Sequence, residues 1–204
     1  LGLLGKKGWL VQPTSDADWI GMGSEGLYPA KKNGKSGFVS ESGDWIIQPQ
    51  FEEVGTFSER MSTYRKGNSW GLINSDGRIG DEAKWKEVKN FTEGIAIAKS
   101  EDGLFYILNS AGDTANPTGF EKICRLKEGY FLVEALGKKG ILENNGNTIL
   151  PLEFDQIEVI SKDLFIVYKN GLAGIINSVG NTLFPIQYEE IKLDWSGQKV
   201  FAKE

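Results

Sequence analysis

Histidine is absent from this 204-residue chain, and cysteine occurs only once, at Cys124. The lack of histidine excludes Ser-His-Asp and Cys-His catalysis and almost every catalytic zinc arrangement. A single cysteine excludes an internal disulfide framework. Because its neighbours Ile123 and Arg125 suit an alternating strand, we expect Cys124 to be a buried structural thiol. No apolar run approaches the roughly 18 residues of a membrane span, so no span is predicted.

Positive charge is also in short supply, with 23 lysines and arginines against 28 aspartates and glutamates and a net charge of −5. The lysines are scattered among the acids, which argues against a nucleic-acid-binding surface. No stretch matches a calcium-binding EF-hand loop or a phosphate-binding glycine loop. We therefore expect neither a metal site nor a cofactor.

Glycine, in contrast, is abundant at 26 residues, and its spacing reveals an internal repeat. Glycines recur at one position of the repeat, with successive separations of 35, 34, 35, 34 and 34 residues. A fixed period of this length is typical of repeat architectures, in which supersecondary units stack on one another. These glycines are Gly8, Gly43, Gly77, Gly112, Gly146 and Gly180.

Each copy of the repeat predicts an antiparallel meander of about three strands. In the third copy, residues 70–74 form a short apolar strand, and Ser75-Asp76-Gly77 fits a three-residue hairpin turn closed by a glycine at positive φ. A second strand then runs to a proline, which has no amide donor and therefore marks a strand end or an edge strand. These prolines are Pro13, Pro49, Pro117, Pro151 and Pro185.

After the proline come an aromatic residue, an acid and a β-branched residue, as in Phe51, Glu52 and Val54. We expect the aromatic and branched side chains to fill the core, and the acid to be solvated or to hold a neighbouring backbone N–H. A third strand follows a Ser-Glu-Gly-like corner. Core packing is predicted for the aromatic residues that recur in register, namely Phe51, Trp70, Trp85, Phe154 and Tyr188.

The predicted fold class is all-β, with six tandem antiparallel β-meander repeats of about 34 residues in one repeat domain, 1–204. No single repeat can bury its own apolar face, so neighbouring repeats must stack. The chain opens inside a first strand and closes on a third strand, which fits either a closed propeller-like ring or an open β-spiral. The approximate repeats are residues 1–35, 36–69, 70–104, 105–138, 139–172 and 173–204.

Three tryptophans stand where other copies of the repeat place polar residues. Trp9 follows a turn glycine where most copies have Asp, Asn or Arg. Trp45 replaces residues such as Thr148. Trp195 lies in a corner that is expected to be exposed to solvent. An aromatic side chain in such a place suggests an exposed flat surface that stacks on a sugar or grips a peptide. The competing interpretation is that each ring only fills a local gap.

Paired carboxylates are the remaining route to catalysis, as in glycoside hydrolysis. The candidate pairs are Asp16/Asp18, Glu52/Glu53 and Glu189/Glu190. Because neighbouring residues of a strand point to opposite faces, we do not expect such acids to converge on one site. A glycan-acting hydrolase is therefore the least favoured function.

The repeat resembles the bacterial WG-repeat family. Its pattern is followed closely by Asn33-Gly34-Lys35, by Gln48-Pro49-Gln50-Phe51-Glu52 and by Trp70-Gly71-Leu72-Ile73, and again by residues 185–189. The tryptophan that gives the family its name survives only at Trp70. The resemblance implies a tandem repeat used for binding or assembly, and it favours an exported bacterial protein of the cell envelope or exterior.

The leading hypothesis from the sequence is a non-catalytic binding or scaffolding module. A protein partner is favoured, and a cell-wall or surface glycan is the alternative. The candidate contact residues are Trp9, Trp45 and Trp195. A third possibility is a spacer within a longer array.

Overall fold

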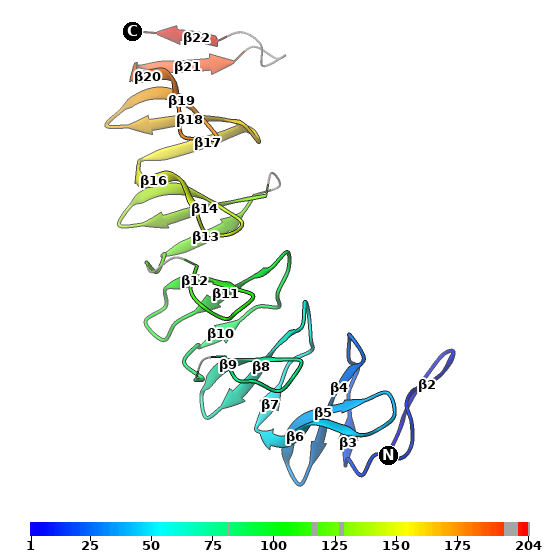
Figure 1. Ribbon diagram of the computed structural model, residues 1–204. Coiled ribbons are helices and arrows are strands. Elements are labelled where there is room, and N and C mark those ends of the chain that lie inside the picture. Colours follow the sequence, from blue (N-terminus) through cyan, green and yellow to red (C-terminus); the bar gives the residue numbers. More distant parts are fainter. Residues whose placement is uncertain (81, 116–117, 127–128, 194–199, 204) are drawn as a thin grey trace. The chain divides into compact units, whose positions relative to one another are not determined.

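Antiparallel β-strands make up all the regular structure in the computed structural model, which describes every residue except 81, 116–117, 127–128, 194–199 and 204 (Figure 1). Pro117 and Trp195 therefore lie outside the described residues. Within each sheet, consecutive strands of the chain pair with each other in antiparallel orientation. The all-β class and the antiparallel meander are both confirmed.

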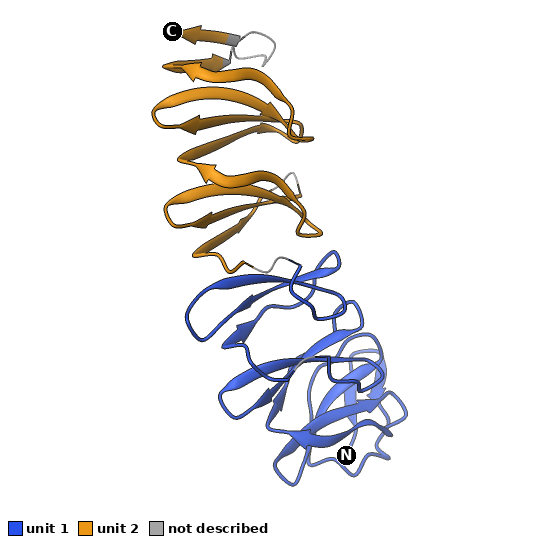
Figure 2. Ribbon diagram, turned by 60° about the vertical axis from the view of Figure 1, so that its left-hand side comes forward, with its two compact units in different colours: residues 1–117 blue, residues 118–204 orange. Residues whose placement is uncertain are grey.

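The chain divides into two compact units, residues 1–117 and 118–204 (Figure 2). The first unit contains four sheets of successive strands. Their strands are β1 (Leu3–Gly5) and β2 (Gly8–Val11); β3 (Trp19–Ile20), β4 (Leu27–Lys32), β5 (Lys35–Ser40) and β6 (Trp45–Phe51); β7 (Glu53–Val54), β8 (Met61–Lys66) and β9 (Ser69–Asn74); and β10 (Glu87–Val88), β11 (Ile95–Lys99) and β12 (Phe105–Asn109).

The second unit contains three sheets built in the same way. Their strands are β13 (Lys122–Arg125), β14 (Tyr130–Ala135), β15 (Lys138–Glu143) and β16 (Thr148–Phe154); β17 (Gln156–Ser161), β18 (Leu164–Lys169), β19 (Leu172–Asn177) and β20 (Thr182–Tyr188); and β21 (Glu190–Leu193) and β22 (Val200–Lys203).

The fullest sheets have four strands, one more than the meander predicted from the sequence. The added strand is 2 residues long in β3, 4 in β13 and 6 in β17. Its branched residue pairs with the next strand, as Ile123 in β13, after Phe120 and Glu121, pairs with Val133 in β14. Strands β6, β16 and β20, which carry the recurring Pro49, Pro151 and Pro185, form the opposite edge of their sheets. The predicted edge position of Pro49, Pro151 and Pro185 is thus confirmed.

The hydrophobic cores lie between consecutive sheets of each unit. In the first unit, Phe38 and Ile47 of the β3–β6 sheet pack in one cluster with Phe57, Tyr64 and Ile73 of the next sheet. In the second unit, a corresponding cluster joins the β13–β16 and β17–β20 sheets. Stacking of neighbours, expected because no repeat can cover its own apolar face, is therefore observed within each unit.

The recurring aromatic residues take the predicted core positions to different degrees. Phe51, Trp85 and Phe154 are buried, whereas Trp70 and Tyr188 are half-buried. The prediction for the cysteine was wrong, because Cys124 is exposed. It lies in the edge strand β13, where Ile123 is half-buried against the sheet, and alternation turns the next side chain toward solvent.

The Ser-Glu-Gly-like corners are two-residue turns that bond to one another from repeat to repeat. Glu25, Glu59 and Glu93 share a φ near 55°, in the left-handed region that side chains rarely adopt. The Glu25 carboxylate accepts from the amides of Glu59 (2.7 Å) and Arg60 (2.9 Å). The Glu59 carboxylate accepts from the amides of Glu93 and Gly94, both at 2.6 Å. These bonds form a carboxylate ladder along the first unit.

The acid that follows the core aromatic residue, or Ala17 in the first copy, forms a second repeated contact. Its carboxylate accepts the amide of the hairpin turn about 15 residues later, which confirms one of the two roles predicted for it. The acid and amide pairs are Asp18 with Asn33, Glu52 with Gly67, Glu121 with Leu136 and Asp155 with Asn170.

Candidate binding pocket

A pocket of about 740 Å³ opens in the first unit between the β3–β6 and β7–β9 sheets. This volume falls within the usual range of roughly 300–1,000 Å³ for ligand sites. Phe51 and Tyr64, whose ring centroids are 4.7 Å apart, are buried beneath it. The remaining lining residues are Lys35, Gln50, Glu52, Arg65, Lys66, Ile79, Glu82 and Ala83.

The pocket lies where the third copy of the repeat lacks a regular second strand. In β6, β16 and β20 this strand is seven residues long and carries a proline. The third copy has no proline there, and among its described residues the isolated bridges Ile73–Ile79 and Trp70–Trp85 stand in place of this strand. The side chain of Ile79 is left 48% exposed, and Glu82 and Ala83 line the pocket instead of pairing in a strand.

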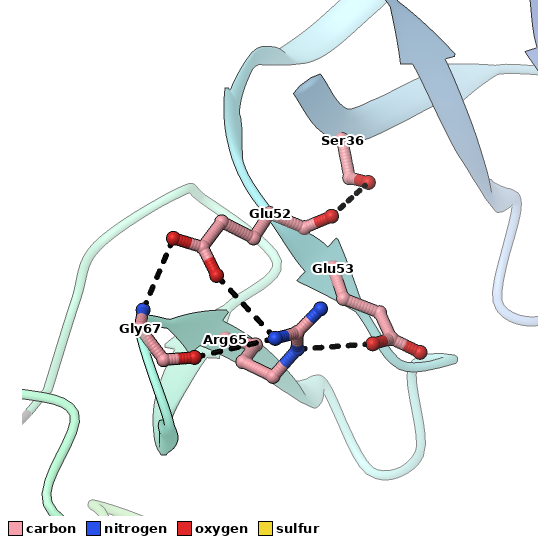
Figure 3. Close-up of polar contacts among 5 residues, drawn as sticks. All are labelled: Ser36, Glu52, Glu53, Arg65 and Gly67. Carbon is pink, nitrogen blue, oxygen red and sulfur yellow. Dashed lines mark hydrogen bonds and ion pairs between the residues drawn. The ribbon is translucent and has the colours of Figure 1, made fainter. Parts of the chain in front are cut away.

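Arg65 binds two neighbouring carboxylates at the pocket wall (Figure 3). Its Nε lies 3.0 Å from an oxygen of Glu53, and its Nη1 lies 3.4 Å from an oxygen of Glu52. Arg65 Nη1 also donates to the carbonyl oxygen of Gly67 at 3.2 Å, and the Gly67 amide donates to Glu52 at 3.1 Å. The buried Ser36 hydroxyl donates to the Glu52 carbonyl at 3.3 Å. This network fixes one side of the pocket.

The contacts of Arg65 contradict the expectation that adjacent acids do not meet at one site. Arg65 stands directly opposite Glu53 in the β7–β8 pair, and its long side chain also reaches the residue before β7. Both carboxylates therefore share one guanidinium. In each of the other two predicted pairs, the two acids bind different partners. Asp16 binds Lys32, whereas Asp18 accepts the amide of Asn33. Glu189 binds Lys203, whereas Glu190 binds Lys192.

Trp9 and Trp45, two of the three predicted tryptophans, lie outside this pocket. Trp9, in β2, is 50% exposed. Trp45 is half-buried against the core of the β3–β6 sheet, and its indole N–H donates to Asp16 Oδ1 at 2.7 Å. Among the described aromatic residues, no ring contact joins Trp9 to Trp45. Trp195 falls outside the described residues, so its predicted role stays a prediction.

Another exposed aromatic residue, Trp19, was missed by the sequence reasoning. It is 49% exposed, and Lys31 Nζ lies 5.7 Å from its ring centroid. In the same place of the β7–β8 pair, Glu53 faces Arg65, so a cation–π contact replaces an ion pair. The sequence signal was available, because the corresponding residues of the other short strands are Glu53, Glu87, Lys122, Gln156 and Glu190.

Three aspartates have a pKa held below the ordinary carboxyl value of 3.8. The Lys32 ammonium and then the Trp45 indole lower the pKa of Asp16, and the Ser100 hydroxyl lowers that of Asp102. The Lys138 ammonium, followed by the Asn170 amide, lowers the pKa of Asp155. These acids are held as carboxylates. A general acid for glycoside hydrolysis needs the opposite shift.

Within the part of the chain that the structure describes, no group of three or more histidine, cysteine, aspartate or glutamate side chains is arranged to hold a metal ion. The same residues contain no helix of the length and hydropathy needed to cross a membrane.

A sequence profile of the WG-containing repeat matches residues 37–69, 70–105 and 140–172, which together are half of the chain. The protein belongs to the WG-repeat family. The first match includes β5 from Gly37 onward, β6 and β8, and the second includes β9 from Trp70 onward and the loop that lines the pocket. No curated protein matches the chain.

Several solved structures are similar to the chain at low identity. The computationally designed Ika8 protein is 12% identical over 93% of this chain and 70% of its own, with a TM-score of 0.39. The WD40 β-propeller domain of Doa1 is 14% identical over 90% and 74%, with a TM-score of 0.34. Sqt1 of Saccharomyces cerevisiae is 12% identical over 96% and 72%, also with a TM-score of 0.34. The fold assignment rests on the strand pairing described above.

Proposed function

We propose that this chain is a non-catalytic binding module that holds a protein partner at the pocket between the β3–β6 and β7–β9 sheets. The single observation that carries the proposal is the pocket itself, where a loop replaces the second strand of one repeat and leaves an aromatic base with a charged rim. The stacked sheets supply a rigid frame, and repeat arrays commonly present binding surfaces of this kind.

The absence of catalysis is part of this proposal, and the state of the carboxylates supports it. Glu52 and Glu53 share Arg65, so neither is available as a general acid or a nucleophile without first losing that ion pair. The lowered pKa values of Asp16, Asp102 and Asp155 run against the acid role as well.

A second candidate function is carbohydrate binding, which the exposed rings of Trp9 and Trp19 favour. Flat aromatic faces stack on sugar rings, and each of these indoles is about half exposed. Neither ring lines the pocket, so the two candidate functions place the ligand at different residues.

An array experiment separates the candidates. The 204-residue chain is screened against short peptides of varied charge and against a panel of cell-wall and surface glycans, with tryptophan fluorescence as the readout. We expect binding to peptides, loss of that binding when Ile79 is changed to Asp, and no hydrolysis of chromogenic glycosides. Glycan binding that survives Ile79→Asp but disappears in Trp19→Ala would replace the protein-partner proposal with the carbohydrate one.

A further inference from the structure

Two lysines at the mouth of the pocket have counterparts in the second unit that are neutralised by carboxylates. Lys35 begins β5 and Lys66 ends β8, as Lys138 begins β15 and Lys169 ends β18. Lys169 Nζ lies 2.9 Å from Glu153 Oε2, and Lys138 binds Asp155. In the first copy, Lys32, which ends β4, likewise binds Asp16. A carboxylate is therefore the ordinary partner of a lysine in these places.

At the pocket both carboxylate partners have changed. Gln50 stands where Glu153 stands, next to the last residue of its strand, so an uncharged amide replaces the acid that pairs with Lys169. Glu52 stands where Asp155 stands, but its carboxylate accepts from Arg65 Nη1 at 3.4 Å and from the Gly67 amide at 3.1 Å. Arg65 stands where Tyr168 stands, so Glu52 has a cationic partner that Asp155 lacks at this place.

Lys35 and Lys66 consequently form no ion pair with any residue that the structure describes. Both are exposed, and both line the pocket. Glu82, the other acid of the lining, is not paired with either of them. The lining carries three cations, Lys35, Arg65 and Lys66, against two acids, Glu52 and Glu82, in a chain whose net charge is −5.

The rest of the lining is suited to an apolar side chain. Ile79 is 48% exposed, Ala83 is half-buried, and the rings of Phe51 and Tyr64 lie beneath. A ligand that satisfies both parts of the lining carries a carboxylate beside an apolar group, and an acidic peptide segment does so with ordinary residues. Charge complementarity and the carboxylates found in the corresponding places elsewhere in the chain both point to this chemistry.

We propose that the pocket recognises an acidic peptide segment, with a glutamate or aspartate carboxylate lying between Lys35 and Lys66 and a neighbouring apolar side chain against Ile79. This inference rests on the proposed function and specifies its partner. The bound carboxylate forms the ion pairs with these two lysines that Asp155 and Glu153 form with Lys138 and Lys169.

The test uses a fluorescein-labelled peptide of alternating glutamate and leucine, with the glutamine-leucine peptide of the same length as its neutral match. Fluorescence polarisation on the 204-residue chain is expected to show binding of the first peptide only. Binding is expected to weaken as salt is added, because the contacts are exposed ion pairs. Lys35→Gln and Lys66→Gln are each expected to weaken binding by about fivefold, a factor typical of one exposed ion pair.

The decisive variant is Gln50→Glu, which restores the carboxylate that Glu153 supplies in the second unit. It is expected to neutralise Lys66 internally and to weaken peptide binding by about fivefold or more, with the fold intact. The matched control is Gln187→Glu, which makes the same charge change at the same place of β20, away from the pocket. That variant is expected to bind like the parent chain.

Equal binding of the two peptides, or parent-like binding by Gln50→Glu with an unchanged urea midpoint, would overturn the acidic-peptide inference while leaving a binding module in place. Failure of acidic, neutral and basic peptides alike would overturn the protein-partner proposal together with the inference.

Discussion

Glu25 and Glu59 occupy the same place in consecutive repeats, and the carboxylate of Glu25 accepts the backbone amide of Glu59 at 2.7 Å. Glu59 repeats the contact with Glu93 at 2.6 Å. Both donors and acceptors lie in turns whose first residue has a φ near 55°. A glutamate in this conformation costs on the order of 1–2 kcal/mol relative to glycine. The carboxylate ladder explains why glutamate occupies this position: glycine has no side chain that could accept the amides of the next turn.

Replacing Glu59 by glutamine tests the ladder. One amide oxygen can still accept a bond, but the second charge-assisted bond is lost, and we expect a loss of about 1 kcal/mol, comparable with the loss of a helix cap. The free energy of unfolding in urea provides the measurement. Glu87→Gln, at an exposed acid of the short strand β10, is the control and should change it by less than about 0.5 kcal/mol.

Arg60 and Gly94 occupy the same place in successive corners and provide a reciprocal test of backbone strain. Arg60 has a φ of 65° where Gly26 and Gly94 have 74° and 80°. We expect Arg60→Gly to stabilise the chain by up to about 1 kcal/mol through relief of the left-handed conformation. Gly94→Ala should destabilise it by about 1 kcal/mol. Destabilisation by Arg60→Gly would show that its contacts outweigh the strain.

Ser62 is a polar residue in an otherwise apolar place, since the corresponding residues are Tyr28, Ala96, Phe131 and Phe165. Its side chain is 2% exposed, and its hydroxyl has no hydrogen-bond partner. A buried hydroxyl without a partner costs about 1–3 kcal/mol. We therefore expect Ser62→Ala to raise the unfolding free energy by about 1 kcal/mol. A loss of stability on thermal or urea unfolding would mean that the hydroxyl makes a contact in solution.

Acid should weaken the fold partly through Asp155. The Lys138 ammonium holds its pKa below the ordinary value of 3.8, so the folded state binds the proton less well than the unfolded state. The resulting stability is present above about pH 4 and is lost as the pH falls through the lowered pKa. We expect the difference between urea midpoints at pH 5 and pH 3 to be smaller for Asp155→Asn than for the parent. An unchanged difference would contradict the ion pair, and Lys138→Gln should act in the same direction.

The periodic glycines and prolines made the all-β meander predictable, because each has a local reason that holds in every copy. Gly43, Gly77 and Gly146 have the positive φ that a three-residue hairpin turn requires, and Pro49 lies in an edge strand. The fourth strand was missed because it is only two residues long in places, as in β3 and β7, and its pairing depends on the strand that follows.

The pocket was not predictable from any one motif. It arises from differences between copies: the missing proline after β9, Gln50 where Asp16 and Glu153 stand in other copies, and Arg65 where Tyr168 stands. Comparing only aromatic residues between copies led to Trp9, Trp45 and Trp195. Comparing charged pairs between copies in the same way identifies Lys35 and Lys66. These two lysines lack the carboxylate partners that Lys138 and Lys169 have in the second unit.

The most direct test of a binding site at this pocket is a titration of the isotope-labelled chain with the glutamate-leucine peptide, followed by NMR. The account predicts concentration-dependent shifts of the amides of Lys66, Gly67 and Ile79, with the amides of Lys169, Asn170 and Thr182 in the corresponding places of the second unit unmoved. Shifts confined to Trp9 and Trp19, or equal shifts in both sets of amides, would contradict it.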